Sequence, residues 1–300
     1  MNIKITAPSK TFLVGDYISL LGGPILVLNT EPRFQLLVTL QGQDEKSVVT
    51  DTSAFFHPDS PAGKFLTQYA SDFAGYHLTF FDPHQGAGGF GASSAQFVML
   101  YALRAEILRC AQDDSESLLT TYQNLAWSGI GPRPSGADCI GQMQGDIGYY
   151  HRAAGELTTL RWPFPEIDFC LLHTGHKINT HQHLQEISMD IIPAQDLEPL
   201  VFAAYAALNT ANCVDFIAAL SEYAELQKNL GLLAMTTQDL LPNILKKKGV
   251  LFAKGCGALG ADVILVLLER AHSLSFAASM QRQGLRAVAL GNETSEGLQL

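Results

Sequence analysis

The stretch GAGGFGASSAQF, residues 86–97, constrains this chain most, because it places four glycines directly before a segment with helical spacing of apolar residues. A loop that wraps around phosphate needs backbone N–H groups that point inward, and side chains at those positions would obstruct them. The N-terminus of a helix behind the loop adds unpaired donors and the positive end of a dipole. A flexible turn with a serine cap fits the same residues equally well.

The glycine spacing in this stretch differs from both common nucleotide-binding motifs. It matches neither G-x-x-x-x-G-K-[ST] nor the G-x-G-x-x-G that follows a strand in a dinucleotide-binding unit. A serine hydroxyl at the start of the helix could still ligate a magnesium ion that bridges phosphates. The candidate phosphate-binding residues are Gly86, Gly88, Gly89, Gly91, Ala92, Ser93 and Ser94.

Around this loop, the pattern of apolar residues predicts a mixture of strands and helices, and therefore an α+β fold. The first forty residues contain four β-like runs, NIKIT, KTFLV, PILVLNT and RFQLLVTL, separated by Pro8 and by GGP at 22–24. Helical spacing predicts helices within 63–73, from Ser93 or Ser94 onward, and over 115–127. YHLTFF indicates a strand, and GIGPRPSG a loop that leads into a buried helix.

The second half of the chain begins after a looser pattern at 153–166, where IDFCLLHTG starts a new apolar strand. Residues up to 248 are expected to be mostly helical, followed by a strand, a glycine-rich turn, a strand, a helix and a terminal strand LRAVAL. A chain of 300 residues is long enough for two ordinary domains. We therefore predict one domain over 1–160 and a second over 161–300.

Composition excludes several classes of function. The chain has 19 basic and 29 acidic side chains, so its net charge of -10 disfavours nucleic acid as a partner. The apolar runs are too short to span a bilayer, which argues against a membrane partner. The N-terminus lacks the apolar core of a signal peptide, and the five scattered cysteines form no C-x-x-C pair. We expect a cytoplasmic protein with reduced thiols and no structural zinc.

Two polar segments outside the loop could carry chemistry. APSKTFLVGDYISLLGGP at 7–24 places Lys10 between two expected strands and Asp16 in a turn. PSGAD at 134–138 places Asp138 behind a turn bounded by proline and glycine. Each residue has an ordinary interpretation, since a lone lysine is usually solvated and a lone aspartate often caps a helix. A general base would have to lie within hydrogen-bonding reach of a substrate hydroxyl.

The segment HTGHKINTHQHL at 173–184 and the loop KGCGALGAD at 254–262 complete the candidates. The histidines of the first segment do not have the spacing of a known zinc signature. Lys177 and Thr180 could instead belong to a phosphate-binding turn between a strand and a helix. The second segment is a glycine-bearing loop between two apolar strands, for which a plain hairpin turn is the alternative.

Taken in order, these segments resemble the motifs of the GHMP kinases, the superfamily of galactokinase, homoserine kinase, mevalonate kinase and phosphomevalonate kinase. APSKTFLVGDYISLLGGP resembles the first motif, A-P-G-K followed by G-E-[YH] and a glycine turn. GGFGASSA resembles the second, G-L-G-S-S-A, and KGCGALGAD resembles the third, a G-A-G-G-G run. PSGAD is similar to the S-G-x-D of the mevalonate branch. The resemblance spans residues 7 to 262.

This resemblance implies an N-terminal domain like ribosomal protein S5 domain 2, a C-terminal ferredoxin-like domain, and ATP with Mg²⁺ bound between them. Asp138 would be the catalytic base, Lys10 would stabilise the charge that develops on the γ-phosphoryl group, and Ser93 would ligate magnesium. A small molecule would be the substrate, and a homodimer is possible. The substrate-binding residues implied are Asp16, Ser135, Gly136, Lys177, Thr180, Gly257 and Ala258.

Several positions depart from the motifs of the superfamily. Ser9 stands where glycine is usual, Asp16 where glutamate is usual, and Ala92 where a serine is common. Leu259 and Ala261 replace glycines in the third motif, so their side chains are expected to intrude on a close backbone approach. The stretch NLAWSGI also lacks the carboxylate that binds magnesium in mevalonate kinases.

The order of motifs favours a particular branch of the superfamily. PSGAD followed by QMQGDIGYY resembles mevalonate and phosphomevalonate kinases more than galactokinase, which suggests a role in isoprenoid precursor synthesis. The cation and histidines of HTGHKINT would suit a phosphorylated substrate. The alternatives are a diphosphomevalonate decarboxylase-like enzyme and a non-catalytic nucleotide- or metabolite-binding protein of the same fold.

Overall fold

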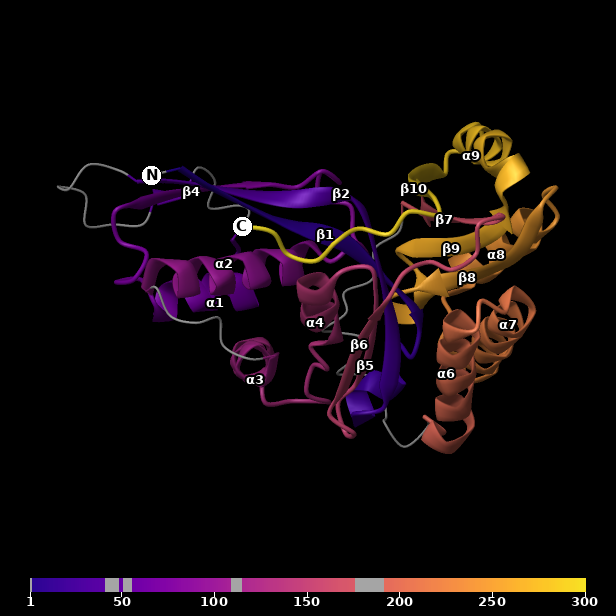
Figure 1. Cartoon of the computed structure of the whole chain (residues 1–300), viewed down its shortest axis with the longest axis horizontal. Helices are drawn as coiled ribbons and strands as arrows, with labels where there is room; N and C mark the ends of the chain where they lie inside the picture. The colour runs from indigo at the N-terminus through magenta and orange to yellow at the C-terminus, as the bar shows by residue number, and fades with distance from the viewer. Residues whose placement is uncertain (1, 41–48, 51–55, 109–114, 176–191) are drawn as a thin grey trace.

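The computed structural model describes residues 2–40, 49–50, 56–108, 115–175 and 192–300. Helices and strands are both present, as the sequence predicts, and the strands form one six-stranded and one four-stranded sheet (Figure 1). The last strand of the larger sheet ends at Leu160 and the first strand of the smaller sheet begins at Ile167. The two sheets therefore lie on either side of the boundary at residue 160, while the division into two domains stays a prediction.

The larger sheet is built on two long, antiparallel strands that pair along most of their length. Its strands are β1 (Asn2–Val14), β2 (Pro24–Leu40), β3 (Val49–Thr50), β4 (Tyr76–Phe81), β5 (Ile147–His151) and β6 (Glu156–Leu160). Their order is β3-β4-β2-β5-β6, and β1 also pairs with β2. The predicted antiparallel start and the predicted strand YHLTFF are confirmed.

The predicted strand break at Pro8 is wrong, because β1 runs through it. The register between β1 and β2 shifts between Ala7 and Ser9, so Pro8 is opposite a bulge of residues 31–33 in β2 and has no partner in the ladder. A bulge leaves one residue unpaired, and a proline there removes no ladder hydrogen bond.

Four helices follow the predicted pattern in this half of the chain. They are α1 (Pro61–Gln68), α2 (Ala92–Leu108), α3 (Ser115–Ala126) and α4 (Ala137–Gln144). The helix expected within 63–73 ends at Gln68, and the one expected over 115–127 agrees to one residue. The central helix α2 packs on β1, β2 and α4, and seven consecutive residues from Phe97 to Leu103 are buried. Local propensity and burial therefore act together to place its N-terminus at the end of the glycine-rich loop.

In the second half, helices pack against an antiparallel sheet. Its elements are β7 (Ile167–His173), α6 (Ala194–Asn209), α7 (Cys213–Asn229), α8 (Met235–Leu245), β8 (Val250–Cys256), η3 (Ala258–Gly260), β9 (Val263–Glu269), α9 (Ser273–Gln281) and β10 (Arg286–Gly291). The strand order is β10-β7-β9-β8. The predicted strand, glycine turn, strand, helix and terminal strand are all confirmed. No helix in the described part of the chain has both the length and the apolar character to cross a bilayer.

After β10 the chain returns to the larger sheet and lies along it, as the yellow segment in Figure 1 shows. We call residues 294–299 the C-terminal strap. Thr6 and Gln299 exchange backbone hydrogen bonds of 2.8 and 2.9 Å, and the Ser295 N–H donates to the carbonyl of Asn29 at 2.9 Å. The strap therefore ties the end of the chain to β1 and β2.

Candidate functional site

The glycine-rich loop lies between β4 and α2 and packs against two segments that are distant in the sequence. Three of its glycines have φ angles between 83° and 88°: Gly86, Gly89 and Gly91. Gly88 lies in the turn that contains Gly89. A Cβ on Gly89 would lie 2.6 Å from Val263 Cγ2, and one on Gly91 would lie 2.7 Å from Lys10 Cγ. At these two positions glycine is required both by the backbone conformation and by the close approach.

The two serines that follow the loop have different environments. Because α2 begins at Ala92, both serines lie in its first turn and neither precedes the helix as a cap would. The Ala95 N–H donates to the Gly91 carbonyl at 2.9 Å, so the three N–H groups before it have no acceptor within the helix. The buried Ser94 hydroxyl donates to the same carbonyl at 3.0 Å. Ser93 is exposed, and its hydroxyl is the one that can reach a ligand.

Lys10 lies beside this loop and is not a solvated surface lysine. It is buried in β1, and its Nζ lies 3.8 Å from the centroid of the Phe12 ring. The backbone N–H of Lys10 donates to the carbonyl of Phe90 at 3.0 Å. Since the lysine stem also contacts Gly91, the first and second motifs form one joined surface.

Asp138 lies in the first turn of α4, directly after a constrained turn. Gly136 precedes the helix with φ of 70°, and a Cβ there would lie 2.2 Å from Leu119 Cδ1. The Ser135 hydroxyl accepts a hydrogen bond from the Ala137 N–H at 3.3 Å. The half-buried Asp138 carboxylate is stabilised by the N-terminal end of the helix dipole. The predicted loop and buried helix are thus confirmed, and together they place the Asp138 carboxylate in the first turn of α4.

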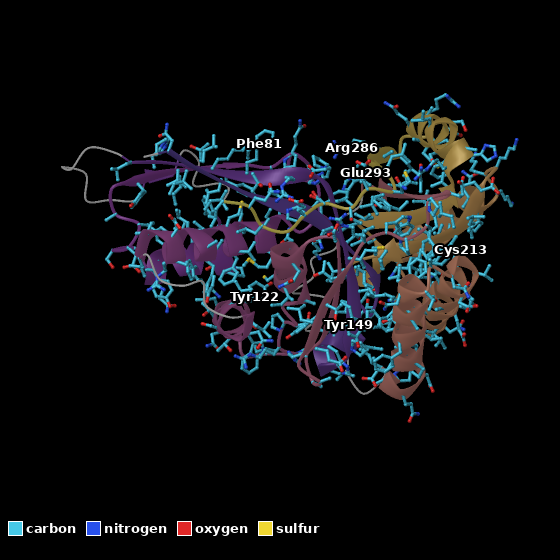
Figure 2. The ribbon with its side chains drawn as sticks, in the orientation of Figure 1. Phe81, Tyr122, Tyr149, Cys213, Arg286 and Glu293 are labelled. Atoms are coloured by element: carbon cyan, nitrogen blue, oxygen red, sulfur yellow. The ribbon has the colours of Figure 1, made fainter. Side chains whose placement is uncertain are left out.

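Lys10 and Asp138 act on the same buried thiol, Cys139. Burial raises the pKa of Cys139 well above its usual value, the Asp138 carboxylate raises it further, and Lys10 opposes the rise. Burial and then Asp138 also raise the pKa of Tyr122, the residue of α3 that Figure 2 labels. No ion pair joins Lys10 to Asp138 among the residues that the structure describes. Both side chains therefore lie near enough to Cys139 to act on the pKa of its thiol.

Gln142 connects the motifs and was missed in the sequence. It is fully buried in α4, one turn after Asp138. Its Nε2 donates to the carbonyl of Pro8 at 2.8 Å and to that of Gly91 at 3.2 Å. A buried glutamine amide with two backbone partners fixes three segments relative to one another. The QMQGD run after PSGAD carried no signal for this contact, because both partners lie far away in the sequence.

The third motif lies against the glycine-rich loop through Asp262 and Val263, which a Cβ on Gly89 would meet. Gly257 has φ of 86°, and its carbonyl accepts from the Gly260 N–H at 2.9 Å across the short helix η3, which Ala258 begins. Leu259 adopts φ of 50°, a left-handed conformation that glycine takes more readily. The replacement of glycine by leucine is therefore accommodated in the backbone without losing the turn.

Asp16 is occupied by a contact that the sequence did not indicate. Its Oδ2 lies 2.9 Å from the Nζ of Lys254 in β8, and the Gln227 amide lies 3.4 Å from the same oxygen. The other oxygen, Oδ1, is buried without a hydrogen-bond partner. The first motif therefore joins β8 through a buried ion pair, and a substrate-binding role for Asp16 stays a prediction.

Part of the predicted site lies outside the described residues. Lys177 and Thr180 belong to that part, together with most of the histidine-rich segment. His173 at the end of β7 is described. Its pKa is lowered, first by burial and then by the charge of Arg286, and the charge of Asp262 opposes this shift. In the described ranges, no group of three or more histidine, cysteine, aspartate or glutamate side chains is arranged to hold a metal ion.

Comparison with solved structures finds the same fold in other proteins. The Streptococcus pneumoniae phosphomevalonate kinase in complex with phosphomevalonate and AMPPNP matches with a TM-score of 0.75 and 15% identity, over 96% of this chain and 99% of that one. L. major mevalonate kinase in complex with R-mevalonate matches at 0.74 and 14%, over 98% and 96%. Lactococcus lactis galactokinase complexed with galactose matches at 0.76 and 12%, over 99% and 95%. No protein-family model and no curated sequence matches this chain.

Proposed function

We propose that this chain, whose fold is that of the GHMP kinases, is an ATP-dependent small-molecule kinase. The confirmed resemblance is one of fold, and it covers kinases with different acceptors. The order of the sequence motifs favours the mevalonate branch, so we propose mevalonate or phosphomevalonate as the acceptor. The strand orders of the two sheets further support an N-terminal domain like ribosomal protein S5 domain 2 and a ferredoxin-like C-terminal domain.

The convergence of four distant segments carries this proposal. Gly91 of the loop contacts the Lys10 stem, and Gln142 of α4 hydrogen-bonds to the carbonyls of Pro8 and Gly91. Gly89 packs on the end of the third motif. A flexible turn before a capped helix would not need this set of contacts, whereas a loop with a defined shape does.

The residues present fit a nucleotide triphosphate and magnesium. The backbone N–H groups at the start of α2 lack helical acceptors, and the exposed Ser93 hydroxyl is free to bind a cation. Magnesium is commonly held by one or two carboxylates, substrate phosphates and water, and a serine hydroxyl at the start of a helix can supply one further oxygen. We propose Ser93 as that protein oxygen. When bound, magnesium neutralises charge on the transferred phosphoryl group.

We propose Asp138 as the base and Lys10 as the group that stabilises the developing charge. The Asp138 carboxylate would accept the proton of the acceptor hydroxyl. The oxygen of that hydroxyl would bond to the γ-phosphorus as ADP leaves. The Lys10 ammonium would stabilise the negative charge on the reacting oxygens. An acceptor phosphate that is already ionised carries no such proton, so the need for Asp138 is greater with an alcohol.

One assay tests the proposal. ADP release is measured against mevalonate, phosphomevalonate, homoserine and hexoses with ATP and Mg²⁺ present. We expect turnover with mevalonate or its phosphate, and with mevalonate a loss of at least about 100-fold in Asp138→Asn, the scale of a lost general base. Asp59→Asn, at an exposed position, is the matched control. Absence of ADP release with every acceptor, together with no binding of ATP and magnesium by calorimetry, would refute the kinase assignment.

The two alternatives give different results in the same experiment. A diphosphomevalonate decarboxylase-like enzyme would release CO2 with its substrate. A non-catalytic binding protein would retain nucleotide binding without ADP release, and the pairing of Asp16 with Lys254 favours it, because that carboxylate is already bound. A kinase that works without a free Asp16 remains our proposal, which the approach of Gly91 to Lys10 and the place of Asp138 at the start of α4 support.

A further inference from the structure

A buried hydrogen bond joins Ser9, the residue before Lys10, to His84 at the base of the glycine-rich loop. Both side chains are buried, and Ser9 Oγ lies 2.6 Å from His84 Nε2. The serine hydroxyl also donates to the Pro32 carbonyl at 2.5 Å. A hydroxyl has one proton, so His84 Nε2–H is the donor to Ser9 Oγ. This assigns the Nε2–H tautomer to a buried histidine.

The His84 ring is fixed on its faces as well as at its edge. Phe90 stacks on it at a centroid distance of 4.2 Å and an interplanar angle of 17°, and Phe34 meets it edge-on at 5.4 Å. The Asp82 carboxylate accepts the backbone N–H groups of His84 and Gly86, each at 2.8 Å. The turn that carries the imidazole is therefore held by its own hydrogen bonds.

These contacts connect β1 to the glycine-rich loop at two points. Ser9 bonds to His84, His84 stacks on Phe90, and the Phe90 carbonyl accepts the Lys10 N–H at 3.0 Å. The next residue, Gly91, packs on the Lys10 stem. We call Ser9, His84 and Phe90 the latch.

We propose that Ser9 and His84 are positioning residues that set the glycine-rich loop against Lys10. The inference rests on the proposed kinase function for its catalytic consequence. It also gives a physical reason for serine at a position where glycine is usual in the superfamily, because only a side chain with a hydroxyl can bridge Pro32 and His84. A histidine that only filled space could be replaced by another aromatic ring, and the latch predicts that it cannot.

The variants separate the hydrogen bond from packing. Ser9→Ala and His84→Phe remove the hydrogen bond, and His84→Phe keeps a ring against Phe90. His84→Gln retains an Nε2–H donor at a similar reach and is the conservative rescue. His57→Phe, at an exposed histidine, is the matched control. Far-UV circular dichroism and thermal unfolding show which variants keep the fold.

Amide hydrogen exchange of the unliganded protein tests the latch without reference to activity. In Ser9→Ala and His84→Phe we expect exchange of Lys10 and of residues 86–91 to accelerate about five- to tenfold, the loss of one net hydrogen bond, with β9 unchanged. His57→Phe should exchange like the wild type. His84→Gln keeps the donor and loses the ring that stacks on Phe90, so it should exchange more slowly than His84→Phe. Unchanged exchange at Lys10 and 86–91 in both folded variants would overturn the proposal, as would acceleration spread evenly over the whole chain.

Steady-state kinetics then separate this inference from the proposed function. If the wild type releases ADP, kcat should fall about tenfold in Ser9→Ala and His84→Phe at unchanged acceptor KM, because misplacement of a reacting group lowers kcat. It should recover in part in His84→Gln, which keeps the donor but not the ring. Equal kcat in all variants would overturn the positioning role. If the wild type has no turnover, the kinase proposal fails, and the exchange experiment alone decides whether the latch holds the loop.

Discussion

The ammonium of Lys254 lies 2.9 Å from the carboxylate of Asp16, and 1% and 6% of the two side chains are exposed. Asp16 follows β1, and Lys254 belongs to β8, so this buried ion pair joins the two sheets. Burial has the largest single effect on the pKa of Lys254 and acts to lower it. The charge of Asp16, its hydrogen bond to the lysine and the nearby Cys256 together outweigh burial and leave the pKa above its usual value. Lys254 is therefore charged in the interior, and its charged form is stabilised by the Asp16 carboxylate.

Removal of one partner of this pair should be strongly destabilising. We expect Asp16→Asn to lower the free energy of unfolding by about 3 kcal/mol, because it leaves a buried charge without its counter-charge. The double variant Asp16→Asn/Lys254→Met should recover part of that loss. Urea denaturation measures both, with Lys228→Met at an exposed pair as control. Equal stability of Asp16→Asn and wild type would show that the pair is not important for folding.

His84 should make the protein sensitive to mild acid. Burial lowers its pKa to about 4 from 6.5, with Arg286 and His173 acting in the same direction and Asp82 in the opposite one. Between these two values the unfolded chain binds a proton that the folded chain does not. Stability should therefore fall as pH drops, by up to about 1.4 kcal/mol per pH unit. Urea denaturation at several pH values in this range measures the free energy of unfolding. The dependence of that free energy on pH should be weaker in His84→Gln than in wild type and in His57→Gln.

Gly91→Ala should damage activity more than stability. The new Cβ would lie 2.7 Å from Lys10 Cγ, so the lysine or the loop must shift, and φ of 85° adds strain of about 1 kcal/mol. Gly284→Ala has φ of 82° in open space and serves as the control for that strain. Stability should fall in both variants, and further in Gly91→Ala because of the clash. ADP release should fall at least about tenfold only in Gly91→Ala. Similar activity in the two variants would contradict a close role for the Gly91–Lys10 contact.

Arg33 should anchor the C-terminal strap. Its guanidinium donates to the Ser295 hydroxyl and to the carbonyls of Glu296 and Gly297, at 2.6 to 2.7 Å. Lysine keeps the charge but not the planar set of donors, so Arg33→Lys should cost on the order of 2 kcal/mol. Hydrogen exchange of the Gln299 amide should accelerate in the same variant. Arg282→Lys, at an exposed position, should leave both measurements unchanged.

The sequence by itself determined the order of the motifs and the elements next to them. Glycines at 86–91 followed by a helix, PSGAD before α4, and the hairpin around KGCGALGAD could all be read locally, because φ preference and apolar period depend on neighbouring residues. Local rules failed at Pro8, where proline usually ends a strand, since the bulge that accommodates it depends on the pairing of β1 with β2.

Only the tertiary structure decided which residues meet. Ser9 and His84 are 75 positions apart, Pro8 and Gln142 are 134 apart, and Asp16 and Lys254 are 238 apart. Each of these side chains has an ordinary surface interpretation when read alone, so the sequence carried no signal for its partner. Burial removes water as a competing partner, and a polar group in the interior must then find another group in the chain. This requirement arises only when the two sheets pack and bury these groups. It explains why the latch and the ion pair form between segments whose order the sequence had already determined.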